Sequence, residues 1–381
     1  MTLIAATFGP TSASAWRALC LAIMTTLLQA CAGPSTFAYV ANADSREISV
    51  LKLDRALGTL QTVQTMALSG VVMPLAINAD KTRLYASLRS EPFGVASFSI
   101  NPANGELTPQ ATAPLPDSMA NIALDRSGRW LFGASYGGHK LSVSPIATDG
   151  APAAATQVLA TGKNAHAAVP DASNRFLFVP TLGSDQVMQW RFDAANGQLS
   201  PNTPAALATR PGAGARHLVL HPNGRHAYLL NELDAGIDLL DLDADAGTLA
   251  FRQSWSTLPP GFIGKPWAAD LHLSPDGRFL YTSERTSSTL AIWAVQADSG
   301  ALTLMGHQAT EQQPRSFQID PSGQWLVAVG QMSNTAALYR IHTATGQLTL
   351  QSRAAVGKNP NWVEIIDLPR ASHDRHHPHP T

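Results

Sequence analysis

Two short patterns recur seven times along the chain, both at intervals of about 45 to 53 residues. The first is an aromatic or apolar residue late in a strand that follows a turn, at Tyr39, Tyr85, Phe132, Phe178, Tyr228, Tyr281 and Val327. The second is a glycine that opens a hairpin, usually as Gly-x-Leu, at Gly58, Gly105, Gly150, Gly197, Gly247, Gly300 and Gly346. A repeat of this length with about four short strands per unit is typical of a β-propeller blade. We therefore predict an all-β chain that forms a seven-bladed β-propeller of four-stranded antiparallel blades.

The two ends of the repeating region are each incomplete. Residues Phe37–Asn42 belong to a unit that lacks its first strand, and Asn361–Ile366 form a lone strand with no unit after it. We predict that the two segments share one blade, which closes the ring and removes its open edges. The propeller domain then occupies residues 31–369.

The first thirty residues have the pattern of an export signal. Arg17 precedes an apolar run that is too short to span a bilayer and that ends at Leu28-Gln29-Ala30-Cys31. We expect residues 1–30 to be a lipoprotein signal peptide and Cys31 to be lipidated, which makes the protein periplasmic or membrane-anchored. The alternative is a cytoplasmic protein whose start codon is mis-assigned.

Composition limits the partners and cofactors. Charged residues make up 14% of the chain and the net charge is -1, so no basic surplus favours nucleic acid, and any membrane contact depends on the lipid anchor. Both cysteines, Cys20 and Cys31, lie near the N-terminus, and the body has no Ser-His-Asp order or histidine-rich ligand spacing. We therefore expect no metal and no cofactor. Residues 370–381 are polar, histidine-rich and broken by proline, so we expect a disordered tail.

The repeat also predicts which side chains meet at one mouth of the central channel. Between antiparallel neighbours, the start of one strand and the end of the next lie at the same edge. Relative to the first marker, these positions fall twelve residues before it and four residues after it. The polar residues found there are His166, Arg216, Arg315, Arg89, Arg285, Glu232, Tyr136 and Gln331.

Four arginines and one glutamate at a single mouth form a strong local excess of positive charge. Buried cations must be paired or must bind an anion, so the mouth is suited to an anionic or carbonyl-rich small molecule. Taken singly, Arg216 and Glu232 could instead form a structural ion pair, and His166 could be a hydrogen-bonded channel histidine. The sequence leaves both alternatives open.

Longer segments carry a family resemblance: Gly214-Ala215-Arg216-His217, Asn231-Glu232-Leu233, Trp267-Ala268-Ala269-Asp270-Leu271-His272, Arg285-Thr286-Ser287 and Gln313-Pro314-Arg315-Ser316-Phe317. From about Phe37 to Trp362, the chain resembles the seven-bladed propeller lactonase family and in particular its bacterial 6-phosphogluconolactonases. The resemblance implies hydrolysis of a sugar lactone, phosphorylated or not. It assigns the family's proposed site of one histidine, two arginines and one glutamate to His166, Arg216, Arg285 and Glu232.

Lactone opening needs an activated water and a stabilised oxyanion. We expect Glu232 to be the general base, with His166 as second candidate, and Arg216 and Arg285 to hold the carbonyl oxygen. The residues expected to bind the rest of the substrate are Arg315, Arg89, Gln331, Tyr136 and His217. Two other functions stay open: a non-catalytic exported propeller that binds a small anion or a partner protein, and a muconate-type lactonising enzyme. The sequence does not give the oligomeric state.

Overall fold

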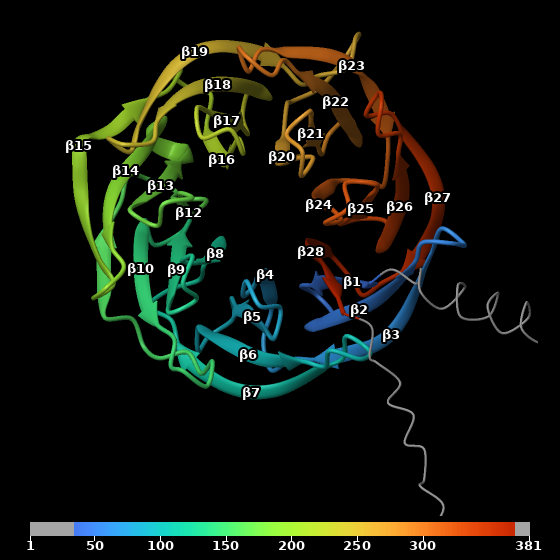
Figure 1. Cartoon of the computed structure of the whole chain (residues 1–381), viewed down its shortest axis with the longest axis horizontal. Helices are drawn as coiled ribbons and strands as arrows, with labels where there is room; N and C mark the ends of the chain where they lie inside the picture. The colour runs from blue at the N-terminus through green and yellow to red at the C-terminus, as the bar shows by residue number, and fades with distance from the viewer. Residues whose placement is uncertain (1–33, 370–381) are drawn as a thin grey trace, which may run out of the picture. The chain divides into compact units, whose positions relative to one another are not determined.

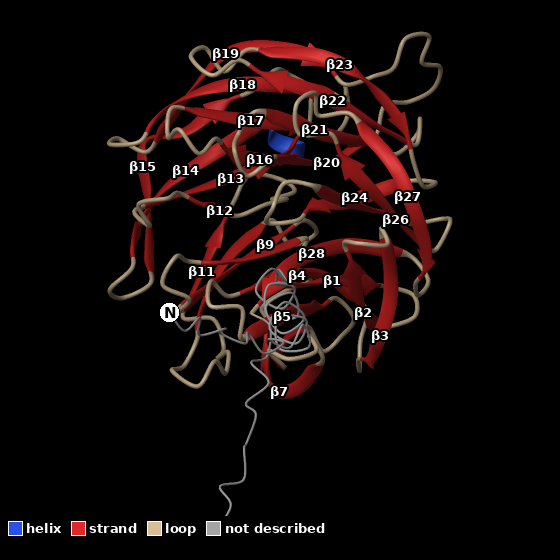
Figure 2. Cartoon of the chain, turned by 45° about the vertical axis from the view of Figure 1, so that its right-hand side comes forward, coloured by secondary structure: helices blue, strands red, loops and turns tan. Residues whose placement is uncertain are grey.

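Strand order in six of the seven sheets follows chain order from the innermost strand to the outermost. The computed structural model of the protein describes residues 34–369, and these residues form seven four-stranded antiparallel sheets arranged around a common centre (Figure 1). The predicted seven-bladed propeller is therefore confirmed. Within this range the one helical segment is the short 3-10 turn η1 (Leu182–Ser184), which Figure 2 shows in blue.

The strands of each blade are given from the innermost to the outermost. The first three complete blades are β4(Val72–Ile77), β5(Arg83–Leu88), β6(Gly94–Ile100), β7(Leu107–Pro114); β8(Asn121–Leu124), β9(Trp130–Ser135), β10(Lys140–Pro145), β11(Gln157–Ala160); and β12(Val169–Pro170), β13(Phe176–Thr181), β14(Gln186–Asp193), β15(Gln198–Ala208). The next three are β16(Ala215–Leu220), β17(His226–Asn231), β18(Gly236–Asp243), β19(Thr248–Ser256); β20(Ala268–Leu273), β21(Phe279–Glu284), β22(Thr289–Val295), β23(Leu302–Ala309); and β24(Pro314–Ile319), β25(Trp325–Gly330), β26(Thr335–Ile341), β27(Leu348–Ala355).

The seventh blade joins the two ends of the described chain. It consists of β28(Pro360–Leu368), β1(Ser35–Asn42), β2(Glu47–Asp54) and β3(Thr59–Ala67). Strand β28 pairs antiparallel with β1 from Ser35 opposite Leu368 to Asn42 opposite Pro360. The prediction that Phe37–Asn42 and Asn361–Ile366 share a sheet is confirmed.

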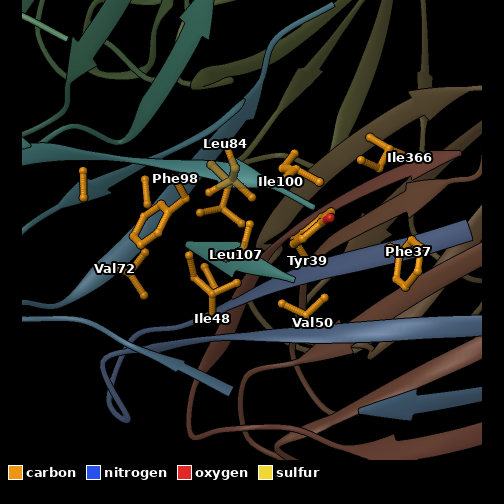
Figure 3. Close-up of a cluster of buried hydrophobic side chains, with 14 of the residues drawn as sticks. Phe37, Tyr39, Ile48, Val50, Val72, Leu84, Phe98, Ile100, Leu107 and Ile366 are labelled. Carbon is orange, nitrogen blue, oxygen red and sulfur yellow. The ribbon is translucent and has the colours of Figure 1, made fainter. Parts of the chain in front are cut away.

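The two repeating patterns of the sequence touch each other across neighbouring blades. Four marker tyrosines each donate a hydroxyl hydrogen bond to the carbonyl oxygen of a hairpin glycine in the next blade: Tyr39 to Gly105 (2.8 Å), Tyr85 to Gly150 (3.0 Å), Tyr228 to Gly300 (2.7 Å) and Tyr281 to Gly346 (2.8 Å). A buried tyrosine needs such a partner for its hydroxyl group. Figure 3 shows Tyr39 among the apolar side chains that fill the space between two blades, including Leu84, Ile100 and Leu107.

The hairpin glycines are also required by space. Gly105 has a φ of +72°, and a Cβ atom there would lie 2.5 Å from the ring of Phe37 in the neighbouring blade. The same relation holds between Gly247 and Phe176, at 2.1 Å. Any larger residue would force the two blades apart, so the recurring glycine is explained by both its backbone conformation and the close approach of an aromatic ring.

Aspartate side chains fix the turns between the first and second strands of several blades. Asp171 is buried, and its Oδ1 accepts the backbone N–H groups of Arg175 at 2.9 Å and Phe176 at 2.8 Å, while Oδ2 accepts that of Ser173 at 2.9 Å. Asp125 and Asp320 accept equivalent bonds in their own turns. These turns set the register of the inner strands, and the register determines which residues reach the channel mouth.

One inner strand is shorter than predicted. We expected His166 to begin an inner strand, but β12 contains only Val169–Pro170, and His166 lies before it. The His166 N–H group donates to the Pro180 carbonyl at 2.9 Å, and Ala165 forms an isolated bridge with Thr181. Because Pro180 has no N–H group, it cannot return a hydrogen bond, and the ladder is interrupted there.

The predicted signal peptide, Cys31 and the whole of the predicted tail lie outside the described residues. Between residues 34 and 369 there is no helix long and apolar enough to cross a membrane.

Candidate active site

A cavity of about 250 Å³ lies at one end of the ring of inner strands, and we call it the mouth cavity. It is lined by Met73, Arg89, Ala120, Tyr136, His166, Glu232, Trp267, Arg285 and Arg315. Six of the eight polar residues that the repeat placed at the mouth are in this set. Of the other two, Arg216 lies against the cavity wall, bonded to Glu232, and Gln331 is directed elsewhere, since its side-chain amide donates to Asn359 Oδ1 at 2.7 Å.

β-Bulges at the start of two inner strands aim arginines at this end of the channel. In β16, Ala215 pairs with Asn231 and His217 with Leu230, so that Arg216 is an extra residue without a partner opposite it. In β24, Arg315 is extra in the same way, between Pro314 and Ser316. A bulge bends the strand and redirects the extra side chain, and bulges are common beside active sites for this reason.

Glu232 follows β17 directly and is held by two arginines. Its Oε2 atom lies 2.8 Å from Arg216 Nε and 2.9 Å from Arg285 Nη2. Arg216 is only 1% exposed, and its Nη1 donates to the carbonyl oxygen of Ala269. Both ion pairs fall on Oε2, whereas Oε1 makes no hydrogen bond to any residue in the described range. The arginines therefore hold Oε2 in place, and Oε1 can contact a molecule bound in the cavity.

The surrounding charges keep Glu232 ionised. Burial alone would raise the pKa of its carboxyl group, but the positive charges of Arg216 and Arg285 outweigh burial and lower that pKa. Arg285 is itself fixed by hydrogen bonds to the carbonyl oxygens of Trp267 and Ala268, each at 3.1 Å. Its guanidinium lies 3.8 Å from the centre of the Trp267 ring, which is cation–π contact. Sequence reasoning did not select Trp267, although it stands directly before an inner strand.

Arg315 is the arginine at the mouth that has neither a hydrogen-bond partner nor an ion-pair partner in the described chain. It lines the cavity and forms no hydrogen bond or ion pair with residues 34–369. Burial and the neighbouring charges of Arg216 and Arg285 lower its pKa, which reflects the cost of holding another positive charge there. Arg89, by contrast, uses Nε to donate to Ser118 Oγ at 2.8 Å and places Nη1 2.9 Å from Met73 Sδ. An anion in the cavity would compensate the charge of Arg315.

His166 lines the mouth cavity and packs against His217, which lines a second cavity deeper in the channel. Its ring packs edge-to-face against Tyr136, with ring centres 5.7 Å apart, and against His217 at 5.0 Å. Burial and, next in importance, the charge of Arg216 hold the pKa of His166 well below its usual value, so the imidazole is neutral. Its Nδ1 atom is enclosed and has no hydrogen-bond partner among the described residues.

The second space is a cavity of about 150 Å³, which we call the inner cavity. Its polar lining consists of Asn121, His217, Asp270, His272, Ser316, Trp362 and Glu364. His217, predicted to bind substrate at the mouth, lines this deeper cavity, because it follows the extra residue Arg216 along β16. Sequence reasoning missed Asp270 and Glu364. Asp270 directly follows the mouth-level position of β20, and Glu364 lies three residues beyond the corresponding position of β28, so their places in the repeat were the available signal.

Charges in the inner cavity are paired. Asp270 Oδ1 lies 2.9 Å from His217 Nδ1, and Asp270 Oδ2 lies 3.3 Å from His272 Nε2. Although burial opposes ionisation, its histidine partners hold the pKa of Asp270 well below the usual value. Burial raises the pKa of Glu364 to about 7, and Trp362 Nε1 donates to its Oε1 at 2.9 Å. No group of three or more His, Cys, Asp or Glu side chains in the described chain is arranged to hold a metal ion.

The described chain is a seven-bladed propeller with an arginine-rich cavity at one mouth of its channel. The family model described as "Lactonase, 7-bladed beta-propeller" matches residues 35–365, and the chain belongs to this family.

Curated relatives and solved structures agree with this assignment. The chain is 42% identical over 328 residues to a protein named 6-phosphogluconolactonase from Serratia proteamaculans, covering 86% of this chain and 98% of the relative. A protein of the same name from Pectobacterium carotovorum is 42% identical over 330 residues, covering 87% and 98%. Among solved structures, the periplasmic gluconolactonase of Pseudomonas aeruginosa superimposes with a TM-score of 0.81 at 26% identity, covering 88% of this chain and 100% of the other.

Proposed function

We propose that this lactonase hydrolyses a sugar lactone, either 6-phosphogluconolactone or a related aldonolactone, to the open acid in the mouth cavity. The observation that carries the proposal is the excess positive charge of the cavity, above all the unpaired guanidinium of Arg315 beside the Arg216–Glu232–Arg285 cluster. A substrate with a polar ester group and an anionic end complements such a cavity. The names of the relatives support a sugar lactone.

In the proposed reaction, Glu232 Oε1 takes a proton from water while the water oxygen attacks the lactone carbonyl. The carbonyl oxygen becomes an oxyanion, which Arg285 stabilises. When the tetrahedral intermediate collapses, the bond from the carbonyl carbon to the ring oxygen breaks, and the proton on Glu232 passes to that oxygen. The products are the hydroxyl and carboxylic acid groups of the open chain, and Glu232 is restored.

We assign Arg216 a supporting role in this scheme. The sequence suggested direct contact with the carbonyl oxygen, but Arg216 is 1% exposed and directs its donors to Glu232 and Ala269. Its position favours holding Glu232 Oε2 so that Oε1 faces the cavity. Arg315, with help from Arg89, would bind a phosphate or carboxylate at the far end of the substrate, because a guanidinium forms charge-assisted bonds with such groups.

A substrate panel tests the proposal. The purified protein is assayed with an aldonolactone, its phosphorylated form and muconolactone, and each rate is corrected for spontaneous ring opening. We expect catalysed hydrolysis of one or both sugar lactones. Exclusive turnover of muconolactone would favour a muconate-type enzyme, and no turnover of any lactone would favour a non-catalytic binding propeller.

We further propose that residues 1–30 are removed on export and that Cys31 is lipidated, leaving the propeller domain at 31–369 anchored to a membrane. The apolar run that ends at Cys31 supports this, and the Pseudomonas aeruginosa neighbour is named as periplasmic. Cys31→Ser should move the protein from the membrane fraction to the soluble fraction. An intact cytosolic protein that begins near residue 36 would contradict the proposal.

A further inference from the structure

The ionised carboxylate of Asp270 determines which nitrogen of the His217 ring carries the proton. An ionised carboxylate only accepts hydrogen bonds, and Asp270 Oδ1 accepts from the backbone N–H of Leu271 at 3.1 Å as well as facing His217 Nδ1 at 2.9 Å. The proton of the neutral His217 ring must therefore be on Nδ1. Because a neutral imidazole carries one proton, the Nε2 atom of His217 is left as an acceptor.

At the boundary between the mouth cavity and the inner cavity, two enclosed ring nitrogens then remain without partners among the described residues. They are Nε2 of His217 and Nδ1 of His166, and the two rings lie edge-to-face with their centres 5.0 Å apart. Enclosed polar atoms rarely stay unsatisfied, so the two neighbouring nitrogens are expected to share one direct hydrogen bond. If His217 Nε2 accepts that bond, His166 Nδ1 must carry the proton.

The consequence reaches the mouth cavity. His166 lines that cavity, and with its proton on Nδ1 its other nitrogen, Nε2, is a hydrogen-bond acceptor. We propose that Asp270 is a positioning residue that fixes the proton positions first in His217 and then in His166, so that His166 Nε2 accepts one hydrogen of the attacking water while Glu232 accepts the other. This inference rests on the proposed lactone hydrolysis in the mouth cavity.

The groups around the two histidines are compatible with this chain of hydrogen bonds. Burial, together with the charges of Arg216 and Arg315, lowers the pKa of His217 to about 4 and that of His166 well below its usual value. Both rings therefore stay neutral at physiological pH, which the sequence of donors and acceptors requires. On the far side of Asp270, burial disfavours the charged form of His272, but the carboxylate outweighs burial and raises the pKa of that ring, and His272 in turn helps to keep Asp270 ionised.

The first test reads the proton positions directly and does not depend on activity. In protein labelled with ¹⁵N in its histidine side chains, NMR distinguishes protonated from unprotonated ring nitrogens, and comparison with single-histidine variants assigns the signals. We expect the proton on Nδ1 in both His217 and His166. In Asp270→Asn, the asparagine can donate to His217 Nδ1, and both protons should move to Nε2. A wild-type His166 protonated on Nε2 would overturn the proposal.

The second test is kinetic. Asp270→Asn should lower kcat by about 10- to 1000-fold with little change in KM, because the water loses an acceptor while the anion contacts of the substrate remain. Asp270→Glu, which restores a carboxylate, should recover part of the rate. Asp245→Asn, at a fully exposed position, is the matched control and should behave as wild type.

The outcomes separate this inference from the proposed function. If the wild type hydrolyses lactones and a folded Asp270→Asn protein keeps wild-type kcat, the inference fails and the proposed function stands. If Asp270→Asn does not fold, His217→Leu removes both ring nitrogens and so breaks the same chain of hydrogen bonds while leaving the Asp270–His272 pair, and it should shift the His166 proton in the NMR spectrum. An unchanged His166 signal in that variant would also overturn the inference.

Discussion

The mouth cavity and the inner cavity are built from the same seven inner strands, yet they manage charge in opposite ways. At the mouth, several arginines surround one glutamate, and Arg315 has no counter-ion in the described chain. One level deeper, Asp270 is paired with two histidines. Because a buried charge must be neutralised, the positive charge at the mouth is balanced only when an anion is bound. The charge of Asp270 in the inner cavity is already balanced by its histidine partners. We infer that the mouth binds substrate and that the inner cavity orients and supports it.

The largest expected effect comes from Glu232→Gln. This change keeps the shape of the side chain and removes the proton acceptor, so kcat should fall by about 10² to 10⁴. Lactone hydrolysis should be compared only between proteins with similar melting temperatures, since disturbing a buried ion-pair cluster can itself unfold a site. A folded variant with wild-type turnover would reject the catalytic role of Glu232.

The next largest effect should come from Arg315, the mouth arginine that has no partner in the described chain. Arg315→Ala should raise KM for a phosphorylated lactone by about 10- to 150-fold, since a hydrogen bond to a charged group contributes about 1.5 to 3 kcal/mol. KM for a neutral aldonolactone should rise much less. Arg252→Ala, which removes a half-exposed arginine from the outer strand β19, is the matched control. Equal effects of Arg315→Ala on both lactones would show that Arg315 does not recognise the anionic end.

The third prediction concerns Glu364 in the inner cavity, whose ionisation should make the free energy of unfolding depend on pH. The carboxyl group of Glu364 ionises near pH 4.5 in the unfolded chain and near 7 in the folded protein. Raising the pH through this window therefore lowers the free energy of unfolding, by at most about 3 kcal/mol, and the loss is complete above pH 7. Denaturant unfolding of Glu364→Gln at pH 5 and pH 8 should show that the variant lacks this loss. A constant difference between variant and wild type at both pH values would contradict it.

The smallest effect should come from Trp267→Leu. The change removes a cation–π contact with Arg285 that contributes about 0.5 to 2 kcal/mol, so kcat should fall by about 2- to 30-fold through looser placement of the guanidinium. Trp267→Phe keeps an aromatic face and should lie between the two proteins. The proposed support of Arg285 would be wrong if the leucine variant turned over lactone at the wild-type rate.

The regular repeat made most of the fold predictable, and local irregularities account for the features that the sequence did not reveal. Seven markers and seven glycines were enough for the blade number, the closing blade and the level at which Glu232, Arg285 and Arg315 lie. The bulges that redirect Arg216 and Arg315 leave no signal in the spacing, because an extra residue in one strand changes neither marker. The depth of His217 depends on which face of β16 meets the channel, and the Asp270 pairing depends on contacts between different blades.

The closing blade has a consequence for how the protein is made. Strand β1 lies at the beginning of the described chain, and its inner neighbour β28 at the end, so the pairing of Ser35 with Leu368 spans almost the whole described sequence. During synthesis, β1 must wait with one edge unpaired until the last strand has left the ribosome. Contacts so distant in sequence form slowly. Transport of the unfolded chain across a membrane would therefore not interrupt ring closure, because the ring can close only once β28 is available to pair with β1.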